Sequence, residues 1–240
     1  MRRVLALTLA LLGLLPPHPA AAAPALVPFA IEYDIRYGAF ASGQSRTELS
    51  RSSIPGRWVI ETNVYAHGFA RLIVPGTISF RSTFELEGAA VRPLVYRLDD
   101  GTAKTDHDVA LDFDWRAGRV TGTAEQQPVS VAVETGLQDA ISIQAAVQSR
   151  LRGGGEPGEM AMIEKNKVKH YRFTLLRREK LKTAIGELDT VVYRSMRDVG
   201  GRETLQWFAP SLGWAVVQAE QYKDGKRVYL TTVRRYEERG

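Results

Sequence analysis

The sequence contains no cysteine. This absence excludes disulfide bonds, thiolate metal sites and thiol catalysis, and it removes the residue to which a lipoprotein anchor would be attached. Histidine is scarce, with four in 240 residues, and no HxH or HExxH spacing suggests a metal site. We therefore expect no metal, no cofactor and no lipid anchor. An enzyme is the least favoured class of function, because no nucleophile, base or metal constellation stands out.

A strong charge of one sign and a long apolar run are also missing. The formal net charge is +5, and it falls to about +3 without Arg2 and Arg3, which is too little to predict nucleic-acid binding. The apolar run over 4–15 is shorter than the roughly 20 residues of a membrane-spanning helix. With two arginines before it and small residues after it, this run predicts a secretory signal peptide over 1–25. We expect a periplasmic protein whose mature chain has no transmembrane span.

Most of the remaining chain has the pattern of β-strands. Between Phe29 and Tyr37 every odd position is apolar and most even positions are charged, which is typical of a half-buried strand. Comparable segments follow at 44–50, 57–66, 78–87, 91–98, 109–115, 119–124 and 129–133, and again at 160–163, 169–176, 188–196, 204–209, 214–222 and 227–236. Residues 38–43 indicate a turn, and Asp224-Gly225 is a strong hairpin signal because both residues tolerate positive φ.

One segment, 135–151, has helical periodicity instead. Thr135 and Gln138 have capping-box spacing, Asp139 would place a negative charge in the first turn, and the glycines at 153–155 offer a left-handed end. Gln144 and Gln148 lie within its apolar stripe and need hydrogen-bond partners if they are buried. Two arrangements remain open: a core helix with its far side in water, and a helix wrapped on more than one side by sheet.

These patterns predict a fold class. Short connections and a single helix favour a mainly β domain over 26–240, built as a large curved antiparallel meander sheet, half-barrel or barrel-like, wrapped around one α-helix.

The segment 68–76 interrupts the meander with an apolar cluster that includes Phe69, Leu72 and Ile73, bounded by glycine and proline. One interpretation is a mobile apolar flap that admits an amphiphile at the open end of the sheet. The other is a buried connection that plugs the core.

Three short motifs resemble a known family. The first is Gln138-Asp139 followed by Ser142 on the lone helix. The others are Thr183-Ala184-Ile185-Gly186-Glu187-Leu188 followed by Val191-Val192, and Gln206-Trp207-Phe208-Ala209 followed by Gly213. Together they resemble the domain of unknown function 3108 family of uncharacterised exported bacterial proteins. The resemblance implies a curved sheet around a helix, no established activity, and a special role for Asp139 and Ser142. The chain departs from the family pattern at Ala145 and Ala146, where relatives often carry bulkier residues.

Two functions remain as hypotheses. The first is a protein that binds or carries an apolar or amphiphilic cell-envelope molecule, such as a lipid-like molecule or an envelope polymer. The second is an accessory protein with a filled interior that docks to an envelope protein. A cavity of a few hundred Å³ would distinguish them, because a docking protein packs its interior to ordinary density. The candidate ligand-binding residues are Phe69, Leu72, Ile73, Asp139, Ser142, Gln144 and Gln148.

Overall fold

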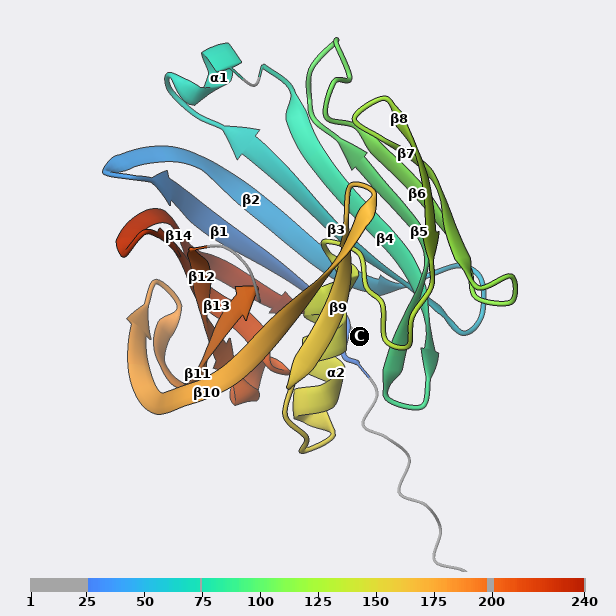
Figure 1. Cartoon of the computed structure of the whole chain (residues 1–240). Coiled ribbons are helices and arrows are strands. Elements are labelled where there is room, and N and C mark those ends of the chain that lie inside the picture. Colours follow the sequence, from blue (N-terminus) through green and yellow to red (C-terminus); the bar gives the residue numbers. More distant parts are fainter. Residues whose placement is uncertain (1–25, 74, 198–200, 240) are drawn as a thin grey trace, which may run out of the picture.

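A computed structural model describes residues 26–73, 75–197 and 201–239. The predicted signal peptide, 1–25, lies outside the described residues. Within these residues, fourteen strands form one antiparallel sheet that is strongly curved and not closed (Figure 1). The first eight are β1 (Phe29–Tyr37), β2 (Phe40–Arg51), β3 (Arg57–Ala66), β4 (Thr77–Glu87), β5 (Ala90–Asp99), β6 (Val109–Asp114), β7 (Arg119–Ala124) and β8 (Gln127–Ala132). The other six are β9 (Glu159–Glu164), β10 (Lys167–Thr183), β11 (Gly186–Arg197), β12 (Arg202–Ala209), β13 (Ala215–Lys223) and β14 (Lys226–Glu238).

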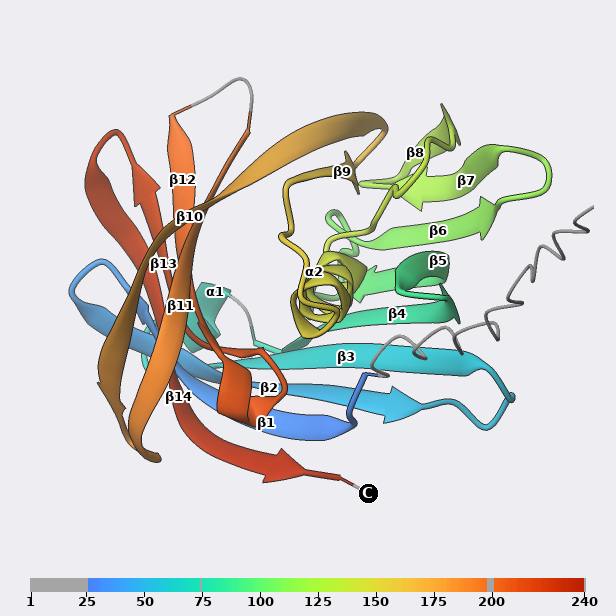
Figure 2. The ribbon, with the colours of Figure 1, turned by 90° about the horizontal axis from the view of Figure 1, so that it is seen from below.

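The sheet consists of two meanders joined in the middle. Strands β1 to β8 pair in chain order, strands β9 to β14 do the same, and β1 pairs with β14, so β8 and β9 form the two edges. Helix α2 (Ser142–Arg152) carries the chain from one edge to the other and lies on the concave side of the sheet (Figure 2). This architecture confirms the predicted curved meander around one helix.

The segment between edge strand β8 and helix α2 pairs with β9, the strand at the other edge of the sheet. The backbone N–H of Gln138 donates to Ala161 O at 2.9 Å, and Ile163 N–H donates to Gln138 O at the same distance. A side-chain contact of 2.7 Å between His170 Nε2 and Glu134 Oε1 lies beside this parallel bridge. The middle of the outer edge of β9, at Ala161 and Ile163, is thereby paired, which shortens one of the exposed strand edges that favour aggregation.

Helix α2 is buried on more than one side, so the second of the two arrangements is the observed one. Three polar contacts tie the helix and the residues before it to β4, to β5 and to the turn between these two strands. Ser82 Oγ donates to Asp139 Oδ2 at 2.6 Å, Gln138 Nε2 to Val91 O at 2.9 Å, and Ser149 Oγ to Ala89 O at 2.7 Å. The buried residues of the helix, which occur all around its axis, are Ser142, Ala145, Ala146, Val147, Gln148, Ser149 and Leu151.

The predicted start of this helix, at residue 135, is wrong. Gly136 has a left-handed backbone (φ 77°), and the backbone of Gln138 pairs with β9, so neither Thr135 nor Gln138 caps the helix. The helical pattern in the sequence continues backwards through 135–141, where the chain instead forms turns on either side of the bridge that Gln138 makes with β9. The predicted end is correct, because α2 stops at Arg152 and Gly154 has a φ of 76°.

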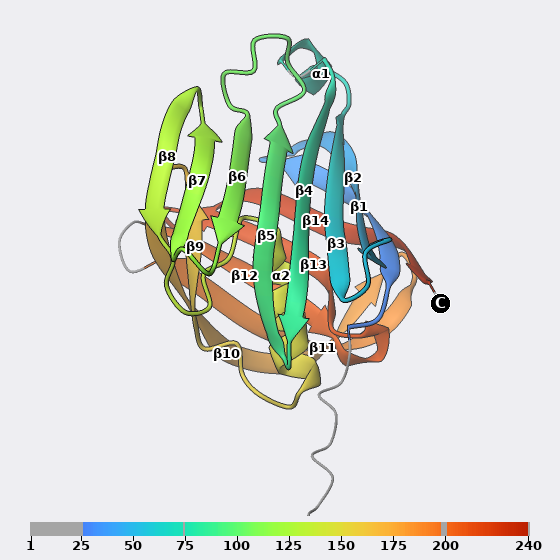
Figure 3. The ribbon, with the colours of Figure 1, turned by 90° about the vertical axis from the view of Figure 1, so that its right-hand side faces the viewer.

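The connections between strands differ in how well the sequence predicts them. Figure 3 shows the one-turn helix α1 (Ala70–Ile73) between β3 and β4, beyond the ends of the strands. The prediction of a turn over 38–43 is wrong beyond Ala39, because β2 already begins at Phe40. The predicted hairpin at Asp224-Gly225 is confirmed by φ values of 51° and 75°.

Candidate functional site

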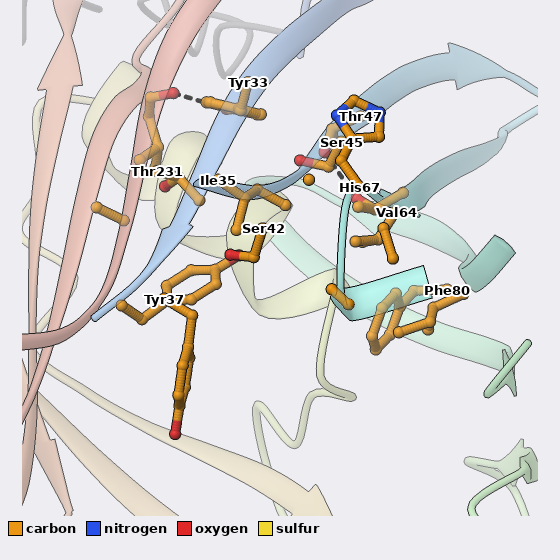
Figure 4. Close-up of a pocket in the computed structure, with 18 of the residues that line it drawn as sticks. Tyr33, Ile35, Tyr37, Ser42, Ser45, Thr47, Val64, His67, Phe80 and Thr231 are labelled. Carbon is orange, nitrogen blue, oxygen red and sulfur yellow. Dashed lines mark hydrogen bonds between the residues drawn. The ribbon is translucent and has the colours of Figure 1, made fainter. Parts of the chain in front are cut away.

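The concave side of the sheet is not filled along its whole length. A cavity of about 1340 Å³ lies between the first four strands and strands β12 to β14. Tyr33 and Ile35 of β1 line one wall (Figure 4). Val216 and Ala219 of β13 also belong to the lining. At the end near α2 the lining consists of Ala140, Ile141 and Gln144.

Large apolar side chains surround the other end of the cavity, where the β1–β2 turn and α1 lie. The exposed fraction is 87% for Phe69, 78% for Phe40 and 65% for Tyr37, and all three line the cavity. Leu72 is 79% exposed and is not among the lining residues, while the side chain of Ile73 lies outside the described residues. The buried-plug interpretation is therefore wrong for Phe69 and Leu72, which lie at the mouth of the cavity or beside it.

The lining is apolar and carries no full charge. Among the described residues that form it there is no Asp, Glu, Lys or Arg, and His67 is its one imidazole. Several of its hydroxyls already have partners: Tyr33 Oη donates to Val216 O at 2.7 Å, and Thr47 and Thr62 share a hydrogen bond of 2.7 Å. Burial raises the pKa of Tyr33 well above its usual value, so this phenol stays neutral. Such a lining is suited to a molecule that is largely apolar and uncharged.

Asp139 and Ser142 lie outside the lining and build the start of α2. The Asp139 side chain is fully buried, and its Oδ1 accepts hydrogen bonds from the backbone N–H groups of Ile141 (3.0 Å) and Ser142 (2.8 Å). In return, Asp139 N–H donates to Ser142 Oγ at 2.9 Å, which is the reciprocal arrangement of a capping box. A capping box therefore exists, four residues later than the predicted one.

The environment of Asp139 acts on its ionisation in two opposing directions. Burial raises the pKa of Asp139 above its ordinary value, and the hydrogen bonds from Ser82, Ser142 and Ile141 oppose that rise by stabilising the carboxylate. The structure thus places Asp139 in the helix cap and against β4. Of the two predicted glutamines, Gln144 lines the cavity, whereas Gln148 is buried elsewhere on the helix.

Of the candidate residues, Phe69 and Gln144 line the cavity, and sequence reasoning missed the lining residues that the strands contribute, including those of β2. Phe40, Ser42 and Gly43 all line the cavity, yet 38–43 had the composition of a turn. The alternation in β1 could have revealed a partner strand, since Tyr37 pairs with Phe40 in a tight hairpin. The local sequence around Ser42 alone carries no such signal.

A separate group of carboxylates occupies the β5–β6 connection, where Asp99, Asp100 and Asp108 lie together. Their oxygens accept hydrogen bonds from backbone groups of the same loop, including Thr102 N–H to Asp100 Oδ1 at 2.8 Å and Asp100 N–H to Asp108 Oδ1 at 2.9 Å. These contacts give the cluster a role in shaping the loop.

A family model described as "Protein of unknown function (DUF3108)" matches residues 32–231. The chain belongs to this family. Every residue that lines the cavity lies within the matched segment, so the cavity is part of the DUF3108 region of this chain. No curated protein matches the sequence.

Solved structures show where else this fold occurs. A β-barrel-like DUF1849 protein from Brucella abortus is similar with a TM-score of 0.58 at 8% identity, over 89% of this chain and 98% of that one. A candidate exported protein with a YmcC-like fold from Bacteroides fragilis reaches a TM-score of 0.41 at 10% identity, over 89% and 99%. A candidate lipoprotein from Parabacteroides distasonis reaches 0.38 at 9% identity, over 88% and 95%. The first of these likenesses supports the barrel-like fold of this DUF3108 chain. Within the described residues, no helix has the length and hydropathy needed to cross a membrane.

Proposed function

We propose that this DUF3108 protein is exported to the periplasm and there binds or carries an apolar or amphiphilic molecule of the cell envelope. The observation that supports this most directly is the cavity of about 1340 Å³ with its uncharged lining. Protein interiors are otherwise packed as closely as organic crystals, with few voids larger than a water molecule. Pockets for drug-sized ligands measure about 300–1,000 Å³, so this space could hold a molecule of lipid size.

Export is supported by the sequence of 1–25, with its paired arginines, short apolar run and small-residue tail. The lack of cysteine supports a mature form without a lipid anchor. The alternative, a docking protein with a filled interior, is less well supported because the space between β1–β4 and β12–β14 is not filled by side chains.

Native mass spectrometry of protein purified from the periplasm tests the proposal. We expect an additional mass that dissociates on activation and that behaves as a lipid on organic extraction. The stripped protein should then raise the fluorescence of N-phenyl-1-naphthylamine, a neutral dye that emits strongly in apolar surroundings.

A variant that fills the cavity makes the test specific. Ala219 lies on β13 with its side chain lining the cavity, so Ala219→Trp should reduce dye binding at least fivefold. Ala132, an exposed residue at the end of edge strand β8, lies outside the lining and provides the matched control Ala132→Trp. Equal dye binding by wild type and Ala219→Trp, with no co-purifying mass, would refute ligand binding in this cavity.

A further inference from the structure

Two segments at the mouth of the cavity expose large apolar side chains. One is the β1–β2 turn, with Tyr37 and Phe40, and the other is the segment around α1, with Phe69 and Leu72. We call these four side chains the apolar rim. Each is at least 65% exposed, and all but Leu72 also line the cavity. Exposed apolar side chains grouped in this way mark a surface that contacts another molecule.

Hydrogen bonds hold the segments of the rim side by side. The backbone N–H of His67, just before α1, donates to Ser42 O near the start of β2 at 2.9 Å. On the other side of the β1–β2 turn lies the β13–β14 turn, because Gly38 N–H donates to Val228 O at 3.0 Å. Three connections therefore lie together at one end of the sheet, and Figure 3 shows α1 there beyond the ends of the strands.

Exposed basic residues accompany the apolar rim. The three connections, 36–40, 67–73 and 223–227, contain one acidic residue, Asp224, and five basic ones. The basic residues, all exposed, are Arg36, Arg71, Lys223, Lys226 and Arg227. Arg227 pairs with a glutamate of β13, and within the described residues the other four form no ion pair. Apolar side chains beside unpaired positive charge complement an anionic phospholipid surface, where negative headgroups lie directly above the acyl chains.

The form of the rim favours a membrane over a folded protein as its partner. The core of a protein interface is packed as closely as a protein interior, which requires a continuous surface on both partners. The rim instead borders the opening of a cavity and is carried by a tight turn and a single helical turn. A fluid bilayer adapts to such an outline, and Phe and Leu together with Lys and Arg are the side chains that membrane-surface segments use.

We propose that this end of the molecule docks on an anionic phospholipid membrane. Phe40, Phe69 and Leu72 enter the acyl-chain boundary, while Arg71 and Lys226 lie at the level of the phosphates. The docking depends only on the rim and its charges. Its purpose rests on the proposed function, because a cavity that opens into the bilayer exchanges an apolar ligand with the membrane without exposing it to water.

Flotation of the protein purified from the periplasm with phospholipid vesicles tests the docking. Vesicles of phosphatidylcholine alone are compared with vesicles that also contain anionic phosphatidylglycerol, each at low and at high salt. We expect the protein to float with the phosphatidylglycerol vesicles, to be released in part by high salt, and to bind phosphatidylcholine alone more weakly.

Leu72→Ser isolates the rim from the cavity, because Leu72 is exposed and lies outside the lining. It should weaken vesicle binding about three- to tenfold, through the loss of one large apolar side chain from the membrane. Its melting temperature, and its binding of the naphthylamine dye without vesicles, should equal those of wild type. Ile54→Ser is the matched control, since Ile54 is half exposed in the β2–β3 turn at the opposite end of the sheet, and it should bind vesicles as wild type does.

The charges are tested by Arg71→Gln combined with Lys226→Gln. This double variant should bind phosphatidylglycerol vesicles about tenfold more weakly and phosphatidylcholine vesicles as wild type does, because each basic residue near an anionic surface contributes about 1 kcal/mol. Equal binding of the anionic vesicles by the double variant and by wild type would contradict the charge complementarity.

The results that overturn the docking differ from those that overturn the proposed function. Wild type that binds dye but neither kind of vesicle would refute the docking alone, as would Leu72→Ser and Ile54→Ser with equal vesicle binding. A dimer in gel filtration that Leu72→Ser converts to a monomer would assign the rim to a second copy of the chain instead. Vesicle binding without dye binding or co-purifying lipid would support the docking and refute the proposed function.

Discussion

Removal of the Asp139 side chain should destabilise the protein by about 2–4 kcal/mol. Substitution by alanine removes the acceptor for the N–H groups of Ile141 and Ser142, and losing a cap of this kind costs about 0.5–2 kcal/mol. It also leaves the Ser82 hydroxyl unpaired in a fully buried position, which costs about 1–3 kcal/mol. Relief from burying a carboxyl group offsets part of this sum, so the expected loss lies below the upper limit of the two contributions.

Urea denaturation followed by tryptophan fluorescence and by far-ultraviolet circular dichroism would measure the loss. Ser142→Ala is the graded comparison, because it removes the one hydrogen bond that Asp139 N–H donates to Ser142 Oγ and should cost only about 1 kcal/mol. If Asp139→Ala and wild type differ by less than about 0.5 kcal/mol, with equal urea dependence, the cap and the Ser82 contact contribute nothing and this reasoning is refuted.

Two further perturbations test the same description of the fold. Burial raises the pKa of Asp139 in the folded protein above its unfolded-state value of about 4. Protonation of this carboxyl therefore stabilises the folded protein at low pH, and that stability is lost as the pH rises through the folded-state pKa. Wild type should therefore lose stability relative to the non-titrating Asp139→Asn as the pH rises from about 4, and urea midpoints of the two proteins that shift in parallel would contradict this. Leu72→Asp should change the stability by less than about 0.5 kcal/mol, because Leu72 is 79% exposed. Leu137→Asp should lower the stability by several kcal/mol, because Leu137 is 0% exposed and the new charge would be buried. Equally low melting temperatures for the two variants would contradict the exposure of Leu72.

The strands were predictable because each carries its own signal. In β1 the odd residues from Phe29 to Ile35 are buried, as their alternation with charged residues indicates, and the bounds of β1, β3 and β7 match the sequence pattern. The start of α2 was not predictable in the same way. The residues before it have helical periodicity, but Gln138 pairs with β9, and that pairing depends on a strand more than twenty residues further along the chain.

The candidate site depends still more on contacts between distant segments. Gln144 could be identified because a polar residue in an apolar helical stripe needs an explanation, and it does line the cavity. Ser42 could not, because its place in the lining depends on the register of β2 against β1 and β3 together. The exposure of Phe69 was undecided for the same reason, because its local sequence suits a buried plug as well as an apolar flap.

The cavity itself follows from a difference in length between the helix and the sheet that surrounds it. Helix α2 has 11 residues and, at about 1.5 Å per residue, is roughly 16 Å long. Strand β2 has 12 residues and, at about 3.3 Å per residue, spans roughly 40 Å. The helix can therefore fill only part of the concave side, and in Figure 1 the strands continue beyond it toward α1. Extension of the helix at its start would close the remaining space, but the Asp139 cap and the pairing of Gln138 with β9 both prevent it. The contacts that hold the helix start in place thus also keep the cavity open.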